Sequence, residues 1–504
     1  MNIRDLTLEQ KIGQLFVTGF PGESPSEEFL RLVSQYDVGN VILFSHNIRS
    51  RHQLAELTSE LFRKISNETG ILPLISIDEE GGVVSRLPQD TAVMPSALAQ
   101  AQTGDEQAVR KAARIVGEEL KALGINFNLA PVLDINSNRN NPLIGVRSFG
   151  ETPEQVIRFG RQAVKGYQEA GILCSGKHFP GHGDTDKDSH LDLPVVNADR
   201  TLLHNRELAP FADLIGQGIP AITVGHMVVP ALEPESVPCT MSRRIVTGLL
   251  REQMRFEGLI LSDCLEMAAI KEHYGISRGA VEGLKAGIDL IYISHTASAV
   301  EEAVLAVRKA VEDGELPEEL IDRAVIRILS AKEKVRACGR EEEAVGTEEQ
   351  MEFAQAFLNR SIRPVPDTGK SPFVTGEDPL FIGIGPERVT LASDVQGARS
   401  FAHFMQENFG GEAISCRIDV AEEEIEECVK RAAGRSSLVV GTLNAHLWPG
   451  QHRLLESLSG LDIPMAHAAL RDPYDLEESP ERVFKLPLYE YTVRAMEIGK
   501  KYFR

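Results

Sequence analysis

The sequence GILCSGKHFPGHGDTDKDSH, residues 171–190, begins as an apolar run and ends as a dense polar loop. We expect a buried strand over residues 172–178, with Lys177 and His178 at its end. From Lys177 to His190 the chain carries three histidines, three aspartates and two lysines. Charged and imidazole groups cost free energy to bury without partners, so stability alone does not explain such a cluster. A functional site is therefore expected where this strand ends.

The same order of apolar run and amphipathic segment recurs along the first 300 residues. Helical periodicity is evident, for example, over residues 53–65, 107–123 and 153–170. Fully apolar strands that alternate with helices predict a parallel sheet covered by helices, and eight such units predict a (β/α)₈ barrel. The expected strands span residues 15–19, 38–44, 72–78, 127–134, 172–178, 221–226, 259–263 and 290–294.

Polar residues follow five of these strands at the point where each one ends. A single strand that ends in a charged residue carries no information, because every strand must leave the core somewhere. In a barrel, however, the carboxyl ends of all strands converge on one face, which is where barrel enzymes hold their chemistry. We therefore expect these side chains to share a site: Asp78, Asp134, Lys177 with His178, His226 and Asp263.

The length of 504 residues exceeds that of a single ordinary core and predicts two domains. We expect an α/β chain with a TIM-like barrel catalytic domain at residues 1–338 and a linker with a helix at 339–378. A smaller α/β sandwich domain is expected at 379–504, with strands over residues 380–384, 413–416, 437–443 and 464–470. We assign no catalytic residue to this second domain.

The composition restricts the partners. The net charge is −21, from 53 basic and 74 acidic residues, which argues against nucleic acid or an anionic membrane as a partner. The first residues lack a charged and then apolar leader pattern, and no run approaches the roughly 18 apolar residues of a membrane span. Six cysteines without CxxC spacing are typical of reduced thiols. We expect a cytoplasmic protein, either a monomer or a homodimer.

Several segments together resemble bacterial glycoside hydrolase family 3 β-N-acetylglucosaminidases of the two-domain type. They occur in family order over residues 5–335, and the long polar loop is the most specific of them. The segment RDPYD at residues 471–475 is similar, more loosely, to the second domain of that family. The segments are KHFPGHGDTDKDSH at 177–190, DEEGG at 78–82 with Arg86, residues 126–134 with Asn141 and Pro142, RSFG at 147–150, and SDCLEM at 262–267.

The resemblance implies roles for individual residues. It implies that Asp263 is the nucleophile and that His190, paired with Asp188, is the acid/base. It implies no metal and no cofactor. Cys264 departs from the family pattern, since many relatives carry an acid or a small residue there. The positions that correspond to sugar-binding residues are Asp78, Arg86, Arg147, Lys177 and His178.

The chemistry of these residues is consistent with those roles. Glycoside cleavage needs a carboxylate on one side of the anomeric carbon and a proton donor on the other. A strand end holds Asp263 rigidly, and a histidine with an ordinary pKa of about 6.5 can give and take a proton near neutrality. Asp188 could orient the His190 ring. We expect Asp184 to have a structural role, accepting hydrogen bonds from backbone amides in the glycine-rich turn.

The resemblance, supported by this chemistry, implies a retaining exo-β-N-acetylglucosaminidase that removes terminal non-reducing β-linked N-acetylglucosamine. Aromatic residues make up only 6% of the chain and Trp448 is the sole tryptophan, which favours small soluble glycosides over polysaccharides. Cell-wall muropeptides and chitooligosaccharides are such substrates. The partner expected is therefore a small-molecule carbohydrate.

Four alternatives stay open at this point. The same site could serve a phosphorylase that uses phosphate as the acceptor, or a family 3 β-glucosidase. A non-catalytic sugar-binding protein could retain the barrel. A metal hydrolase is the remaining alternative, although Lys177 would repel a cation and the spacing matches neither a helical HExxH motif nor an EF-hand loop. Its ligands would come from His178, His182, Asp184, Asp186, Asp188 and His190.

Overall fold

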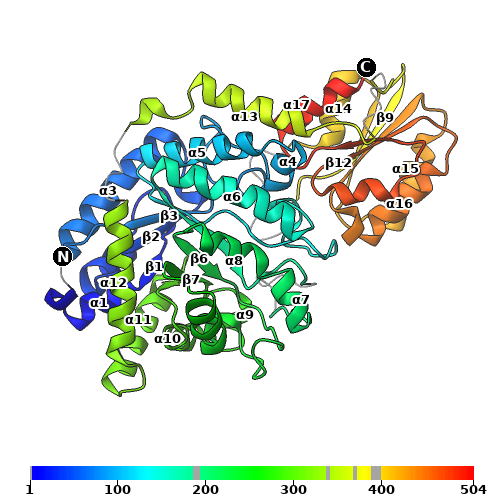
Figure 1. The fold of residues 1–504 in the computed structure, drawn as a ribbon. Helices are drawn as coiled ribbons and strands as arrows, with labels where there is room; N and C mark the ends of the chain where they lie inside the picture. Colours follow the sequence, from blue (N-terminus) through cyan, green and yellow to red (C-terminus); the bar gives the residue numbers. More distant parts are fainter. Residues whose placement is uncertain (1–2, 186–192, 336–340, 367–371, 388–398) are drawn as a thin grey trace.

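The computed structural model describes residues 3–185, 193–335, 341–366, 372–387 and 399–504, and it contains two α/β units (Figure 1). In the first unit, eight parallel strands close into a barrel in sequence order, with β1 paired to both β2 and β8. This confirms the predicted (β/α)₈ barrel. The strands are β1 Phe16–Thr18, β2 Asn40–Leu43, β3 Leu74–Ile77, β4 Phe127–Asn128, β5 Leu173–Phe179, β6 Ala221–Val224, β7 Leu259–Cys264 and β8 Leu290–Tyr292.

The fourth strand is shorter than the predicted span of residues 127–134. Pro131 lacks an N–H and cannot donate to a sheet ladder, so regular pairing stops at Asn128. The chain nevertheless stays beside β5, because Leu133 N donates to Lys177 O at 2.6 Å. Asp134 is consequently held next to the end of β5.

Amphipathic helices cover the outside of the barrel. In α6, Thr152 caps the N-terminus, and Gly171, at φ 79°, ends the helix where a left-handed residue is needed. Gly166 lets α6 approach α5 closely, since a Cβ there would lie 2.5 Å from Arg110 O. The helices of this unit include α1 Leu8–Gln14, α2 Glu27–Tyr36, α3 Arg51–Thr69, α4 Ala97–Gln102, α5 Glu106–Ala122, α6 Pro153–Ala170, α7 Arg200–Asn205, α8 Ala209–Gly216, α9 Ala268–Lys271, α10 Ile276–Ala286, α11 Ala297–Glu312 and α12 Glu318–Lys334.

The second unit is a five-stranded parallel sheet in the order β10-β9-β11-β12-β13. Its last strand, β13 Phe484–Pro487, is not among the predicted strands, because a short segment with a lysine and a proline has a weak strand pattern. It pairs at the sheet edge with β12. The other elements are β9 Pro379–Ile384, β10 Glu412–Cys416, β11 Ser437–Thr442 and β12 Met465–Ala469, with helices α14 Phe401–Phe409, α15 Glu422–Ala432, α16 Pro449–Ser459 and α17 Val493–Gly499.

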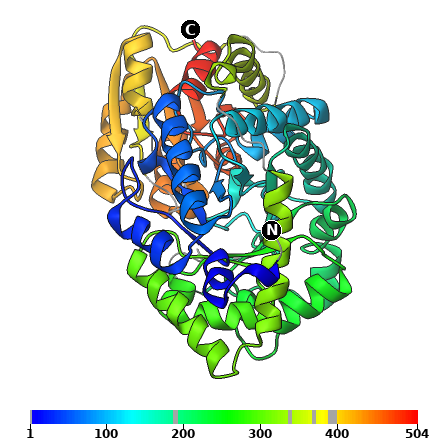
Figure 2. The ribbon, with the colours of Figure 1, turned by 90° about the vertical axis from the view of Figure 1, so that its left-hand side faces the viewer.

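Helix α13, Glu348–Ser361, joins the two units by lying across α4 and α5 and reaching α17 (Figures 1 and 2). The apolar core of the second unit includes Leu98, Ala99 and Val146 of the barrel. The two units therefore share buried surface. Among the described helices, none combines the length and the apolar character needed to cross a membrane.

Polar contacts also connect the second unit to loops of the barrel. Asp472 Oδ1 accepts a hydrogen bond from Val146 N at 2.9 Å, and Asn136 Nδ2 donates to Tyr474 Oη at 2.7 Å. Arg494 donates to the carbonyls of Val93 and Met94. The second unit thus holds the loop that follows β4 and a loop beyond β3.

Candidate active site

A cavity of about 640 Å³ opens at the carboxyl ends of the barrel strands. It also receives loop residues that follow β2, β7 and β8, such as His46, Glu266 and His295. The structure therefore brings together residues that are far apart in the sequence, from the ends of strands β2 to β8 and the loops beyond them. The predicted site residues that line the cavity are Asp78, Arg86, Arg147, Lys177, His178 and Asp263.

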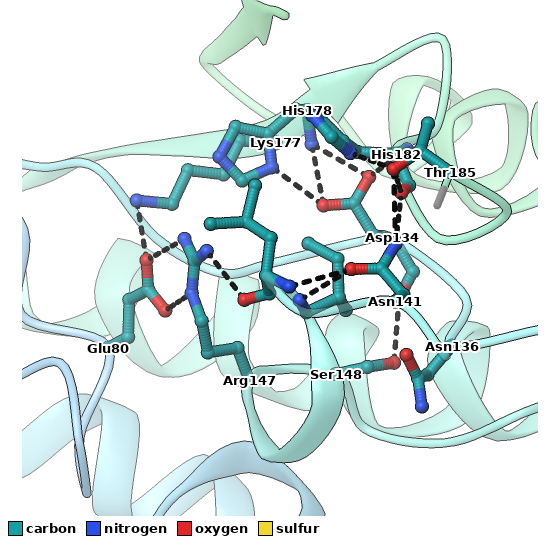
Figure 3. Close-up of polar contacts among 12 residues, drawn as sticks. Glu80, Asp134, Asn136, Asn141, Arg147, Ser148, Lys177, His178, His182 and Thr185 are labelled. Atoms are coloured by element: carbon teal, nitrogen blue, oxygen red, sulfur yellow. Dashed lines mark hydrogen bonds and ion pairs between the residues drawn. The ribbon is translucent and has the colours of Figure 1, made fainter. Parts of the chain in front are cut away.

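Lys177 and Arg147 converge on one buried carboxylate, that of Glu80 (Figure 3). Lys177 Nζ lies 2.7 Å from Glu80 Oε1 and 2.6 Å from Asp78 Oδ1. Arg147 binds Glu80 with two donors, Nε at 2.9 Å and Nη2 at 2.9 Å. Such a bidentate pair fixes the plane of the guanidinium.

This arrangement keeps all three groups charged. Burial opposes the charge of Glu80, but Arg147 and Lys177 outweigh it and hold the pKa of that carboxyl well below its usual range. Burial also opposes the charge of Lys177, and the carboxylates of Asp78 and Glu80 keep its pKa above the ordinary value. The base of the cavity therefore presents fixed cationic donors and a carboxylate, a set that suits sugar hydroxyls.

A second buried carboxylate, Asp134, organises the end of β5. His178 Nδ1 donates to Asp134 Oδ2 at 2.6 Å, and His182 N donates to Oδ1 at 2.7 Å (Figure 3). Burial would raise the pKa of Asp134, but His178 and His182 keep it below the ordinary value. Because Nδ1 of His178 is the donor, a neutral ring has Nε2 as its acceptor.

The loop after β4 connects Arg147 to the start of the predicted acid/base loop. Asn141 Nδ2 donates to His182 O at 2.8 Å and to Thr185 Oγ1 at 3.2 Å. Asn141 Oδ1 accepts from Leu143 N and Ile144 N in the turn that precedes Arg147. Asn141 therefore holds the turn before Arg147 and the segment at 182–185 in a fixed position relative to each other.

Asp263 lies at the end of β7, where its Oδ1 accepts a hydrogen bond from Cys264 N at 2.8 Å. His226 supports this backbone, since its Nε2 donates to Cys264 O at 3.0 Å and its Nδ1 pairs with Thr240 Oγ1. Burial raises the pKa of the Cys264 thiol to about 12, so the residue that departs from the family pattern is a neutral neighbour of Asp263.

The other polar residues of the loop that follows β5 differ in what the structure shows of them. Asp188 and His190, the predicted acid/base pair, lie outside the described residues. Burial, with the nearby His178, lowers the pKa of His182 to about 4, so its ring is neutral near pH 7. Asp184 forms an ion pair with Arg206, which gives it a structural contact through its side chain.

Glu80 is a buried carboxylate of the site that was not predicted as a site residue, whereas Asp134 was expected in the site but without a named partner. Glu80 follows Glu79 directly, and the sequence offers no signal for which of the two faces the cations. Asp134 is visible as a polar strand end, but its role as the partner of His178 depends on the chain path around Pro131. Among the described residues, the histidine and acid side chains of 177–185 do not converge on a point that could hold a metal ion.

Comparisons with known proteins agree with this architecture. The model of the glycosyl hydrolase family 3 N-terminal domain matches residues 7–331. A solved structure of a glycoside hydrolase family 3 β-N-acetylglucosaminidase from Paenibacillus sp. str. FPU-7 is 36% identical in sequence. It covers 98% of this chain and 96% of its own, with a TM-score of 0.88.

Two curated relatives each match 66% of the chain. Beta-hexosaminidase A from Pseudoalteromonas piscicida is 36% identical over 369 residues, which are 66% of this chain and 62% of that protein. Beta-hexosaminidase LpqI from Mycobacterium tuberculosis is 34% identical over 341 residues, 66% of this chain and 85% of that protein. The chain thus spans less than two thirds of the first of these relatives.

Proposed function

The chain belongs to glycosyl hydrolase family 3, and on that premise we propose that it is a retaining exo-β-N-acetylglucosaminidase. Its substrates would be small glycosides with a terminal non-reducing N-acetylglucosamine, such as muropeptides or chitooligosaccharides in the cytoplasm. The observation that carries the proposal is the presence of Asp263 in the same cavity as Asp78, Lys177 and Arg147. A cavity of about 640 Å³ is in the range of small-ligand sites.

In this proposal the base of the cavity holds the terminal sugar. Asp78 accepts from sugar hydroxyls, while Arg86 and Lys177 donate to others, and His178 accepts through Nε2. The ion pairs of Glu80 with Arg147 and Lys177 set the positions of the donors before substrate arrives. A site with prearranged polar groups rejects a sugar that leaves one of them unpaired.

The chemical steps proceed by two displacements at the anomeric carbon. An Asp263 carboxylate oxygen bonds to this carbon as the bond to the leaving oxygen breaks, and His190, oriented by Asp188, gives its proton to that oxygen. His190 then takes a proton from water, whose oxygen displaces Asp263 and restores the enzyme. Two inversions retain the β configuration.

A single panel of assays tests the proposal. Nitrophenyl N-acetylglucosaminide and nitrophenyl glucoside are each incubated with the purified chain, with and without phosphate, and Asp263→Ala serves as the control for contaminating activity. We expect hydrolysis of the N-acetylglucosaminide, little turnover of the glucoside and no effect of phosphate. Preference for the glucoside would indicate a β-glucosidase, and sugar 1-phosphate as the main product would indicate a phosphorylase. Either result refutes the proposal.

A further inference from the structure

Three side chains of different chemistry lie together in the wall of the cavity, beside Asp263. Cys264 comes from the end of β7, Glu266 follows it, and His295 comes from the loop after β8. Their possible ligand atoms, a sulfur, a carboxylate oxygen and a ring nitrogen, all lie within 4.8 Å of one another. Among the described residues, this is the one group of three or more histidine, cysteine or acidic side chains with converging ligand atoms.

The barrel itself creates this convergence. Cys264 pairs with Tyr292 in the register of β7 and β8, and Leu265 N donates to Tyr292 O at 2.8 Å. His295 N donates to Glu266 Oε2 at 2.6 Å, so the carboxylate is already fixed to the loop that carries the histidine. The His295 ring also packs on Phe44, with ring centroids 4.8 Å apart. The three ligand-bearing segments are therefore held by contacts that do not depend on a metal.

A set of one thiolate, one imidazole and one carboxylate favours Zn²⁺ over hard cations. Zinc binds these groups at about 2.0–2.3 Å, so ligand atoms around one ion lie roughly 3–4 Å apart. In the structure the three ligand atoms lie within 4.8 Å of one another, so they would have to move about 1 Å closer together to bind one ion. Rotation of the side chains can provide this movement. Mg²⁺ and Ca²⁺ prefer oxygen ligands throughout and should not bind here.

We propose that Cys264, Glu266 and His295 form an inhibitory site for Zn²⁺ or a similarly soft divalent cation. Binding replaces the proton of the Cys264 thiol, which passes to solvent, by a sulfur–metal bond. The ion would occupy the cavity wall next to Asp263, attract its carboxylate and reduce its reactivity toward the sugar. The cation is not a cofactor in this proposal. The inhibition rests on the proposed glycosidase activity, whereas the binding does not.

Binding is tested first, with Co²⁺ as a spectroscopic probe of the site. The full-length chain is titrated with Co²⁺, and the thiolate-to-cobalt charge-transfer absorption in the near ultraviolet is recorded before and after addition of Zn²⁺. We expect the absorption in the wild type, its loss in Cys264→Ser and its displacement by Zn²⁺ but not by Mg²⁺. Cys239→Ala, which removes a buried thiol outside the cavity, should keep it. An absent band in the wild type, or an unchanged band in Cys264→Ser, overturns the proposal.

Inhibition is tested next, with each variant compared with its own rate in a chelator. Zn²⁺ should inhibit turnover of nitrophenyl N-acetylglucosaminide in the wild type. The half-inhibitory concentration should rise about tenfold or more in Cys264→Ser and in His295→Gln. His295 is exposed, so that variant should remain folded even if Cys264→Ser does not. Equal inhibition of all variants overturns the inhibitory role, and if no activity is found, the cobalt titration still decides whether the site binds metal.

Discussion

Glu79 and Glu80 are adjacent buried carboxylates in opposite electrostatic surroundings, and we predict that substitution by glutamine affects them in opposite directions. Burial raises the pKa of Glu79 to about 7, although Arg86 N and Leu87 N donate to its Oε2. Arg147 and Lys177, in contrast, hold the pKa of Glu80 well below its usual range. The first carboxylate destabilises the folded protein at neutral pH, and the second stabilises it.

The magnitude for Glu79 follows from linkage. Its folded pKa is above the ordinary 4.5, so stability is unaffected below that pH, falls as the pH rises to about 7, and is constant above it. At 1.36 kcal/mol per pH unit the loss amounts to about 3 kcal/mol. Glu79→Gln keeps an oxygen acceptor for the two backbone amides and has no charge, so it should recover much of this loss at pH 8 and little at pH 5.

Glu80→Gln should do the reverse. The substitution leaves Arg147 and Lys177 buried with Asp78 as the remaining carboxylate partner of Lys177. Removal of one partner from a buried ion pair typically costs about 3–5 kcal/mol. The amide nitrogen of the glutamine would also face one of the three donors that bind Glu80.

The assay is thermal unfolding of the wild type and both variants at pH 5 and pH 8. At pH 8, Glu79→Gln should melt above the wild type and Glu80→Gln well below it. At pH 5, Glu79→Gln and the wild type should nearly coincide, whereas Glu80→Gln stays lower. Equal destabilisation by both substitutions, or a Glu79→Gln variant that melts below the wild type at pH 8, would refute the assignment of charges.

Two further substitutions probe the positioning of the site. Asp472→Ala removes the acceptor for Val146 N and opens space beside Gly145, where an added Cβ would lie 2.5 Å from Asp472 Oδ1. The loss of this contact should misplace Arg147, so KM should rise by about tenfold and kcat should change less. An equal effect on KM and kcat would contradict this. His190→Ala should lose far more activity on alkyl glycosides than on nitrophenyl glycosides, which need little protonation; equal losses would contradict a role as the acid.

The sequence predicts most of the barrel because apolar strands and amphipathic helices alternate clearly and five of the eight expected strands end in a polar residue. The exceptions have local physical causes. Pro131 interrupts the pairing of β4, and β13 is a short edge strand whose lysine and proline weaken its pattern. Such segments acquire their structure from neighbouring strands that their own sequence does not reveal.

The site is predicted in part for a related reason. Asp78, Lys177 and Asp263 can be predicted because each is a polar residue at the end of an apolar strand, a pattern that is visible in the sequence alone. The fold decides which side chains these residues contact. It is Glu80, and not Glu79, that forms the ion pairs with Arg147 and Lys177. The contact of Asp472 with the loop after β4 forms only when the second unit packs on the barrel. No motif or spacing in the sequence predicts that packing.

The anomeric configuration of the first-formed product tests most directly whether Asp263 is a nucleophile in a double displacement. Proton NMR spectra are recorded within the first minutes of turnover of a β-N-acetylglucosaminide, before mutarotation mixes the anomers. A double displacement on Asp263 releases the β anomer first, and the α anomer appears later by equilibration. Initial release of the α anomer would mean a single inverting displacement by water and would contradict the role of Asp263.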